Sequence, residues 1–295
     1  MSGFRVGDIV ARRSYGSDLL FRVQEIIGEK VILKGISYRI EADAHISDLE
    51  IQKENKVIEY HRKSFDLADR RIDFLNRSAR IKSMKRGYYR NFSYNTPIEN
   101  YSASVKILHI DGDSDYLSQC VDRYKKLGLD VIGEFVQERE QASGIYKLLS
   151  EIKPDILVLT GHDGFIKGDG NYFNIDNYRN SKYFIEAVKE ARRYERDMDD
   201  LIIFAGACQS MYYNIIRAGA NYASSPYRVL IHALDPVFVC QKIAFTEVNK
   251  IIKPKDVIGL TITGYKGIGG LETKGKMRQG FPLEPNELGN NWEIK

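Results

Sequence analysis

The feature that most constrains this chain is the regular alternation, from residue 105 onward, of short apolar runs with longer amphipathic segments. Short apolar runs bounded by turn residues are typical of buried strands, and their alternation with helical patterns is typical of a parallel sheet covered by helices. We therefore expect an α/β domain with helices on both faces of the sheet. The expected strands are 105–110, 130–136, 156–160, 201–205 and 229–233, and the expected helices are about 114–127, 141–152, 179–196, 210–218 and 236–250.

Two of the expected strands run into glycine and a reactive side chain. The third leads into Gly161-His162-Asp163-Gly164, and the fourth leads into Gly206-Ala207-Cys208-Gln209-Ser210. Parallel sheets present functional groups at the carboxyl ends of their strands. A thiol needs a base to become a nucleophile, and imidazole titrates near neutral pH. The pair therefore predicts thiol chemistry.

The neighbours of Cys208 favour a reactive thiol. Small residues around it would leave the sulfur accessible and its backbone N–H free for an oxyanion, and a helix starting near Ser210 would lower the thiol pKa. A buried, inert cysteine is the alternative for Cys208, and a polar residue that merely caps its strand is the alternative for His162. Together, the two residues favour a thiol hydrolase.

The first hundred residues divide into two further zones. Residues 4–51 contain short β-branched and aromatic runs at 8–12, 20–26, 30–34 and 38–41, which predict a small SH3-like β-barrel with a docking role. Between His61 and Arg90 ten Lys or Arg face three Asp, and the pattern is helical to about Lys85 before Gly87. We interpret this basic stretch as a solvated connector, with an RNA-binding segment as the alternative.

Composition excludes several classes. The 295 residues suffice for a large core, and the net charge of +4 does not by itself imply a nucleic-acid partner. No apolar run approaches the length of a membrane span, and the first residues lack the apolar core of a signal peptide. Three cysteines without C-x-x-C spacing support neither disulfides nor a zinc site, so we expect a cytoplasmic protein with no metal and no cofactor.

Resemblance to known families sharpens these expectations. The order of strands, with a histidine 46 residues before a cysteine, resembles the caspase-like cysteine peptidases, although His162-Asp163-Gly164 has one residue more before glycine than that class. Longer segments resemble the YabG family of sporulation-specific cysteine endopeptidases of endospore-forming Firmicutes. They include Val6–Gly16, Leu33–Asp43, Thr160–Gly164, Tyr178–Phe184, Phe204–Ser210, Ala218–Pro226, Leu230–Pro236 and Ile262–Gly270.

The YabG resemblance implies an endopeptidase of the mother cell that processes spore-coat and germination-related proteins and favours cleavage after arginine. Cys208 would be the nucleophile and His162 its base, with the N–H groups of Cys208 and Gly164 as oxyanion donors. Protein substrates are the expected partners, without nucleic acid or membrane, and retention in the spore coat is left open. The expected domains are a barrel at 1–54, the connector at 55–103, a caspase-like α/β domain at 104–280 and a tail at 281–295.

An arginine preference calls for carboxylates near the scissile bond. Asp111 and Asp113 follow the first strand of the α/β domain, and Asp235 follows the expected fifth strand. The alternative is that Asp111 and Asp113 cap the helix that starts near Ser114. If the enzyme favours arginine, the basic stretch Arg77–Arg90 would also be a site of self-cleavage.

Two other functions compete with the peptidase. Asp111-Gly-Asp113 after an apolar strand resembles the first motif of haloacid-dehalogenase-type phosphatases, which bind Mg²⁺. A non-enzymatic nucleic-acid-binding protein that uses the barrel and the basic stretch is the second alternative.

Overall fold

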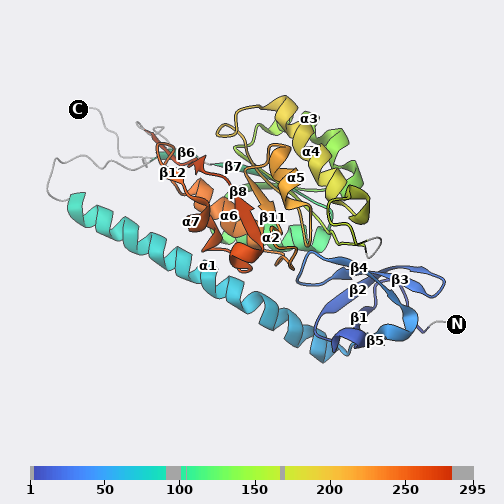
Figure 1. The fold of residues 1–295 in the computed structure, drawn as a ribbon. Coiled ribbons are helices and arrows are strands. Elements are labelled where there is room, and N and C mark those ends of the chain that lie inside the picture. Colours follow the sequence, from blue (N-terminus) through green and yellow to red (C-terminus); the bar gives the residue numbers. More distant parts are fainter. Residues whose placement is uncertain (1–2, 91–100, 104, 167–169, 281–295) are drawn as a thin grey trace.

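The computed structural model describes residues 3–90, 101–103, 105–166 and 170–280. It contains an N-terminal antiparallel sheet, a long helix and a larger domain in which helices cover both faces of a six-stranded sheet (Figure 1). The described residues thus form a mixed α/β protein.

The N-terminal sheet has five antiparallel strands in the order β4-β3-β2-β1-β5. They are β1 (Ile9–Arg12), β2 (Leu20–Ile27), β3 (Lys30–Gly35), β4 (Glu41–His45) and β5 (Leu49–Ile51). The expected strands at 8–12, 20–26 and 30–34 are confirmed. The expected strand at 38–41 is wrong, because β4 begins only at Glu41 and the preceding residues turn away to contact the larger domain.

The larger sheet has the order β13-β11-β10-β9-β7-β8, with all neighbours parallel except β11 and β13. The expected strand at 229–233 is wrong, and its place is taken by the shorter β11. The apolar run at 229–233 instead passes the carboxyl ends of the strands, where its buried residues produce the same sequence pattern as a strand. The strands are β7 (Lys106–Asp111), β8 (Asp130–Phe135), β9 (Ile156–Thr160), β10 (Ile202–Ala205), β11 (Tyr222–Ser224) and β13 (Ile268–Gly270).

The helices form a layer on each face of this sheet. Along β7, Ile107 packs into one core cluster while Leu108 and Ile110 pack into the other, as the alternation of side chains along a strand requires. α2 and α6 cover the first face, and α3, α4 and α5 cover the second. Their bounds are α2 (Ser114–Lys126), α3 (Gln141–Ile152), α4 (Ser181–Tyr194), α5 (Tyr212–Arg217), α6 (Asp235–Ala244) and α7 (Pro254–Ile258).

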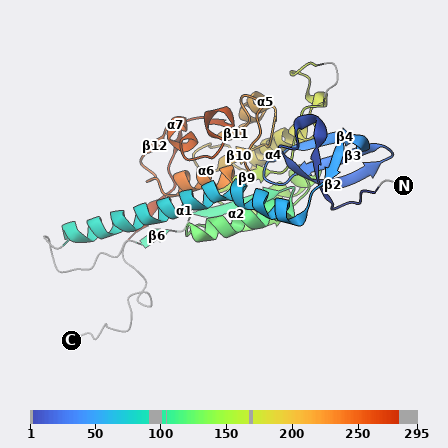
Figure 2. The same ribbon diagram turned by 90° about the horizontal axis from the view of Figure 1, so that it is seen from below.

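The basic stretch forms one helix, α1 (Glu54–Arg90), which lies along the larger domain (Figures 1 and 2). The expectation of a solvated connector is wrong for its first half, because Phe65, Ala68 and Ile72 are buried in the same core cluster as both sheets. The break expected at Gly87 is also wrong, since the helix continues to Arg90. The helix is therefore part of the packed structure.

Two small antiparallel pairs complete the fold. β12 (Ile251–Ile252) pairs with β14 (Thr273–Lys274), and β15 (Arg278–Gly280) pairs with β6 (Tyr101–Ala103). Within the described residues, no helix combines the length and apolar character needed to span a bilayer. The expected tail at 281–295 lies outside the described residues.

Candidate active site

The loops that carry His162 and Cys208 lie side by side. His162 follows β9 and Cys208 follows β10, and these two strands are adjacent and parallel in the sheet. Their carboxyl ends therefore meet at one edge, as the sequence predicts. The side chain of Gln209 ties the loops together, because its Oε1 accepts the N–H of Phe165 at 2.9 Å.

Cys208 is fully buried, with its sulfur beside the backbone of the 229–233 segment. The N–H of Ile231 donates to Cys208 Sγ at 3.0 Å. Burial raises the pKa of Cys208 well above the ordinary value of a thiol. The expected lowering of this pKa by a helix at Ser210 is wrong, because α5 begins at Tyr212 and is only six residues long. In this structure Cys208 is a neutral thiol.

The turn at Cys208 has an unusual backbone. Gln209, the next residue, has φ of 57° and so occupies the left-handed region that non-glycine residues seldom adopt. Its N–H is held by Val229 O and Ser225 Oγ. Strained backbone of this kind concentrates at functional sites, where the surrounding structure enforces it.

His162 is also fully buried, and its ring stacks on Tyr116 with ring centroids 5.0 Å apart. Among the described residues, neither ring nitrogen has a hydrogen-bond partner. Asp113 Oδ2 lies 3.9 Å from Nδ1 of the ring. Burial, reinforced by the charge of Lys34, lowers the pKa of His162 well below its ordinary value. The ring is therefore neutral at neutral pH and able to accept a proton.

A buried glutamate fixes the backbone of His162. Glu138 Oε1 accepts the N–H of His162 at 2.7 Å, and burial raises the pKa of Glu138 to about 7. Two glycines make room for its carboxyl group, because a Cβ at Gly112 or Gly161 would collide with it. Glycine at these two positions is thus a packing requirement of the site.

Asp163 connects three elements around the site. Its carboxylate accepts hydrogen bonds from Ser210 Oγ at 2.8 Å, Ser181 Oγ at 2.5 Å and the N–H groups of Asn180 and Gly164, each at 2.8 Å. Burial raises the pKa of Asp163 to about 6. This carboxylate holds the His162 loop, the Cys208 loop and the start of α4 in one arrangement.

Two backbone N–H groups of the loops point at the same atom. The N–H of Cys208 and the N–H of Asp163 donate to the carbonyl oxygen of Arg39, at 3.1 and 3.2 Å. Gly164, the expected second donor, gives its N–H to Asp163 Oδ1 instead. Two convergent N–H donors on one carbonyl are the arrangement that stabilises an oxyanion in acyl transfer.

The side chain of Arg39 enters a closed acidic pocket. Its Nη1 lies 2.7 Å from Asp111 Oδ2, its Nη2 donates to Ala233 O at 2.9 Å, and its guanidinium lies over the ring of Tyr116. Arg39 and Asp111 are both fully buried. Burial alone would raise the pKa of Asp111, but the Arg39 charge outweighs it and lowers that pKa well below the ordinary value.

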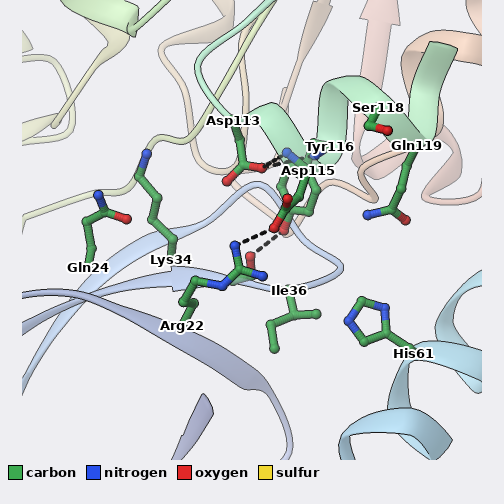
Figure 3. Close-up of a pocket in the computed structure, with 11 residues that line it drawn as sticks. Arg22, Gln24, Lys34, Ile36, His61, Asp113, Asp115, Tyr116, Ser118 and Gln119 are labelled. Atoms are coloured by element: carbon green, nitrogen blue, oxygen red, sulfur yellow. Dashed lines mark hydrogen bonds and ion pairs between the residues drawn. The ribbon is translucent and has the colours of Figure 1, made fainter. Parts of the chain in front are cut away.

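The other two candidate carboxylates have structural partners. Asp113 caps α2 by accepting the N–H groups of Asp115 and Tyr116, each at 2.9 Å. It also faces a groove of about 300 Å³ between the N-terminal sheet and α2, opposite Lys34 (Figure 3). Asp235 is buried and accepts the N–H groups of Ile262 and Thr263. Asp111 is therefore the candidate that the structure shows in contact with a guanidinium.

The phosphatase alternative has no support. Asp111 is already ion-paired with Arg39, and the part of the chain that the structure describes holds no cluster of three or more acidic, histidine or cysteine side chains able to bind a metal ion.

Sequence reasoning missed four residues of this site: Arg39, Tyr116, Glu138 and Asp163. Asp163 lies next to His162 in the sequence and could have been singled out as a buried anchor. The other three come from distant segments and carry no local motif, so only the fold brings them together.

Comparison with known proteins identifies the family. The sequence profile of the YabG peptidase U57 family matches residues 5–282. The chain is 41% identical over 288 residues to the sporulation-specific protease YabG of Bacillus subtilis (strain 168), a match that covers 96% of this chain and 99% of that protein. The chain therefore belongs to the YabG peptidase family U57, and it is a protease.

Proposed function

We propose that this protein is a cysteine endopeptidase that cleaves after arginine, with Cys208 as nucleophile and His162 as general base. Its proposed substrates are spore-coat and germination-related proteins, and its proposed location is the mother-cell cytoplasm or the spore coat. The relative in Bacillus subtilis is a sporulation-specific protease, which supports the setting. The sheet order, with His162 and Cys208 after the adjacent strands β9 and β10, supports a caspase-like domain, and the N-terminal antiparallel sheet is compatible with an SH3-like barrel.

One observation carries the catalytic proposal: the N–H groups of Cys208 and Asp163 converge on a single carbonyl oxygen, while the side chain of that residue lies against Asp111. A substrate arginine in this position would have its carbonyl polarised by two N–H donors. Its guanidinium would be held by Asp111, the carbonyl oxygen of Ala233 and the face of Tyr116. Asp113 and Asp235 are secondary candidates for this role.

The proposed mechanism starts from a neutral Cys208 thiol and a neutral His162 imidazole. His162 takes the thiol proton as Cys208 Sγ forms a bond to the scissile carbonyl carbon, and the tetrahedral oxyanion is held by the N–H groups of Cys208 and Asp163. Asp113, beside Nδ1, stabilises the imidazolium that forms. Collapse breaks the C–N bond as His162 protonates the leaving amine. Water, deprotonated by His162, then hydrolyses the thioester and regenerates the thiol.

The test compares peptides that differ only in the residue before the scissile bond. With peptides supplied at concentrations on the order of millimolar, we expect the wild type to prefer arginine over the uncharged glutamine. Asp111→Asn should reduce the ratio of kcat/KM for arginine over glutamine by about 30-fold or more, since a guanidinium without its buried carboxylate loses roughly 2–5 kcal/mol. Asp130→Asn is the matched control, because it removes an exposed carboxylate at the start of β8 and should leave the ratio unchanged.

A preference for arginine that survives Asp111→Asn in a folded protein would place the specificity pocket elsewhere. Cleavage that shows no preference at the residue before the scissile bond would reject arginine specificity altogether.

A further inference from the structure

Residues 37–41 cross the carboxyl ends of the strands, directly over the two loops of the candidate site. Their backbone pairs with the segment 231–233 in the manner of an added strand. The N–H of Arg39 donates to Ile231 O at 3.0 Å, and the N–H of Ala233 donates to Ser37 O at 3.0 Å. Between them, Tyr38 and His232 form an antiparallel bridge. Extended pairing with an exposed backbone edge is one of the ways in which proteins bind peptides.

The backbone is held before and after the peptide bond between Arg39 and Ile40, and the N–H of that bond donates to Tyr38 O at 2.8 Å in a tight turn at Arg39. On one side, the Arg39 carbonyl accepts the N–H groups of Cys208 and Asp163. On the other side, the N–H of Glu41 donates to Asp163 O at 2.9 Å. A substrate would need these contacts to present its scissile carbonyl to Cys208.

The side chain of Arg39 completes the likeness to a substrate. It fills the pocket of Asp111 and Ala233 and has no exposed surface. Backbone pairing, carbonyl position and side-chain recognition thus coincide in one residue, and that residue is an arginine.

We infer that residues 37–41, which we name the inhibitory segment, act as a built-in pseudosubstrate that occupies the active site through Arg39 and keeps the peptidase inactive until the segment is displaced. This inference rests on the proposed arginine-specific peptidase. It goes further in naming the chain's own segment as the ligand of the specificity pocket. Because the segment is tethered, it competes at an effective concentration on the order of millimolar, so a substrate present at micromolar concentration is excluded.

A purely structural role for Arg39 gives a different expectation. A buried ion pair is weak grounds for stability, because removing two charges from water offsets most of their attraction. If Arg39 served only to join the two domains, its replacement would alter stability without changing the reactivity of Cys208 in the protein that remains folded.

The experiment measures the rate at which iodoacetamide alkylates each cysteine of the full chain, resolved by peptide mass spectrometry. In the wild type, Cys208 should react slowly. In Arg39→Ala the alkylation rate of Cys208 should rise at least tenfold. The alkylation rate of Cys240 should not change, because that residue is buried in α6 and accepts a hydrogen bond from the Tyr124 hydroxyl. Arg13→Ala, which removes an exposed arginine in the turn after β1, should leave all rates unchanged.

A second variant guards against misfolding of Arg39→Ala, which leaves Asp111 without its partner. Arg39→Lys keeps a positive charge for Asp111 but offers fewer donors, so it should raise the rate of Cys208 by a smaller factor. Rapid alkylation of Cys240 in Arg39→Ala would reveal unfolding. In that case the alkylation rate of Cys208 in Arg39→Lys tests the inference. N-acetyl-arginine amide should protect Cys208 in the folded variant and not in the wild type.

Equal alkylation of Cys208 in the wild type and in a folded Arg39 variant would overturn the inference. Alkylation does not depend on peptide hydrolysis. A variant with a freely reactive Cys208 that cleaves no arginyl peptide would therefore support the inhibitory segment and reject the proposed peptidase specificity.

Discussion

At the scale of single residues, the site holds the Cys208 thiol and the His162 imidazole in their neutral forms. Burial raises the pKa of Cys208 and lowers that of His162, so neither carries a charge at neutral pH in this structure. The thiolate must therefore form by proton transfer to His162 when a carbonyl is in place, or after the inhibitory segment has left and solvent has entered. Both routes agree with an imidazole that has no hydrogen-bond partner among the described residues.

The residue-scale prediction concerns Asp163, whose pKa is raised by burial to about 6. The folded state holds this proton more tightly than the unfolded chain. The stabilisation is therefore complete below about pH 4 and is lost as the pH rises through about 6. A shift of this size corresponds to roughly 3 kcal/mol.

Asp163→Asn should accordingly remove one share of the fall in unfolding free energy between about pH 4 and 6, measured by urea denaturation at several pH values. Glu138 and Asp235, whose pKa values burial also raises, should keep their own shares. The matched control is Asp130→Asn, which changes an exposed carboxyl group and should leave the slope intact. An unchanged slope in Asp163→Asn would mean that another group produces the pH dependence.

At the scale of elements, the sequence predicts best where a local pattern is sustained. The strands near 105, 130, 156 and 201 and the helices near 114, 141 and 179 are all present, because apolar period and turn residues agree there. The errors fall at 38–41 and 229–233. Both segments are apolar or aromatic because they pack against each other over the strand ends, and a strand-like pattern cannot distinguish this from pairing within a sheet.

The same limit applies to α1. Its sequence pattern predicts a helix. Because Phe65, Ala68 and Ile72 are few among many Lys and Arg residues, the pattern does not indicate that one side of the helix is buried. The self-cleavage predicted for 77–90 stays a prediction. Because this stretch is helical, cleavage there requires the end of α1 to unwind before it can enter an extended binding site.

The element-scale prediction uses two phenylalanines of α1. Phe65 is 6% exposed and packs edge-on against His232, whereas Phe74 is 66% exposed. Phe65→Ala should lower the unfolding free energy by about 3 kcal/mol, and Phe74→Ala by less than about 0.5 kcal/mol. Chemical denaturation of both variants measures the difference. Equally small losses of unfolding free energy in the two variants would favour the interpretation of this helix as a solvated connector.

At the scale of the whole molecule, the three zones of the sequence converge on the active site. His232 illustrates this convergence, because its ring contacts both Tyr38 of the N-terminal zone and Phe65 of α1. Leu234 N donates to its Nδ1 and its Nε2 donates to Ser64 O, consistent with a pKa that burial lowers to about 4. The N-terminal zone and α1 thus both pack against the segment 229–233, whose Ile231 N–H donates to Cys208 Sγ.

The grooves beside the inhibitory segment lie where a bound substrate would continue past its scissile bond. One of about 660 Å³ is lined by Ile40 and Glu41 together with Phe165 and Gln209, so it continues from the Arg39 carbonyl on the leaving-group side. The sequence indicates Cys208, His162 and an acidic pocket. It gives no indication that an arginine 123 residues before His162 fills that pocket, because only the tertiary fold brings these residues together.

The most direct test of the central claim, that Cys208 is the nucleophile of an arginine-specific site, is covalent labelling with a peptidyl arginine chloromethyl ketone. In Arg39→Ala, where the inhibitory segment no longer fills the pocket, we expect one adduct per chain, formed by displacement of chloride by Cys208 Sγ and located by peptide mass spectrometry. The wild type should form the same adduct at least tenfold more slowly. In the Arg39→Ala background the adduct should be absent after Cys208→Ala, and His162→Ala should form it far more slowly. Labelling of Cys120, Cys240 or another residue in its place, with peptidase activity lost in step, would contradict the account.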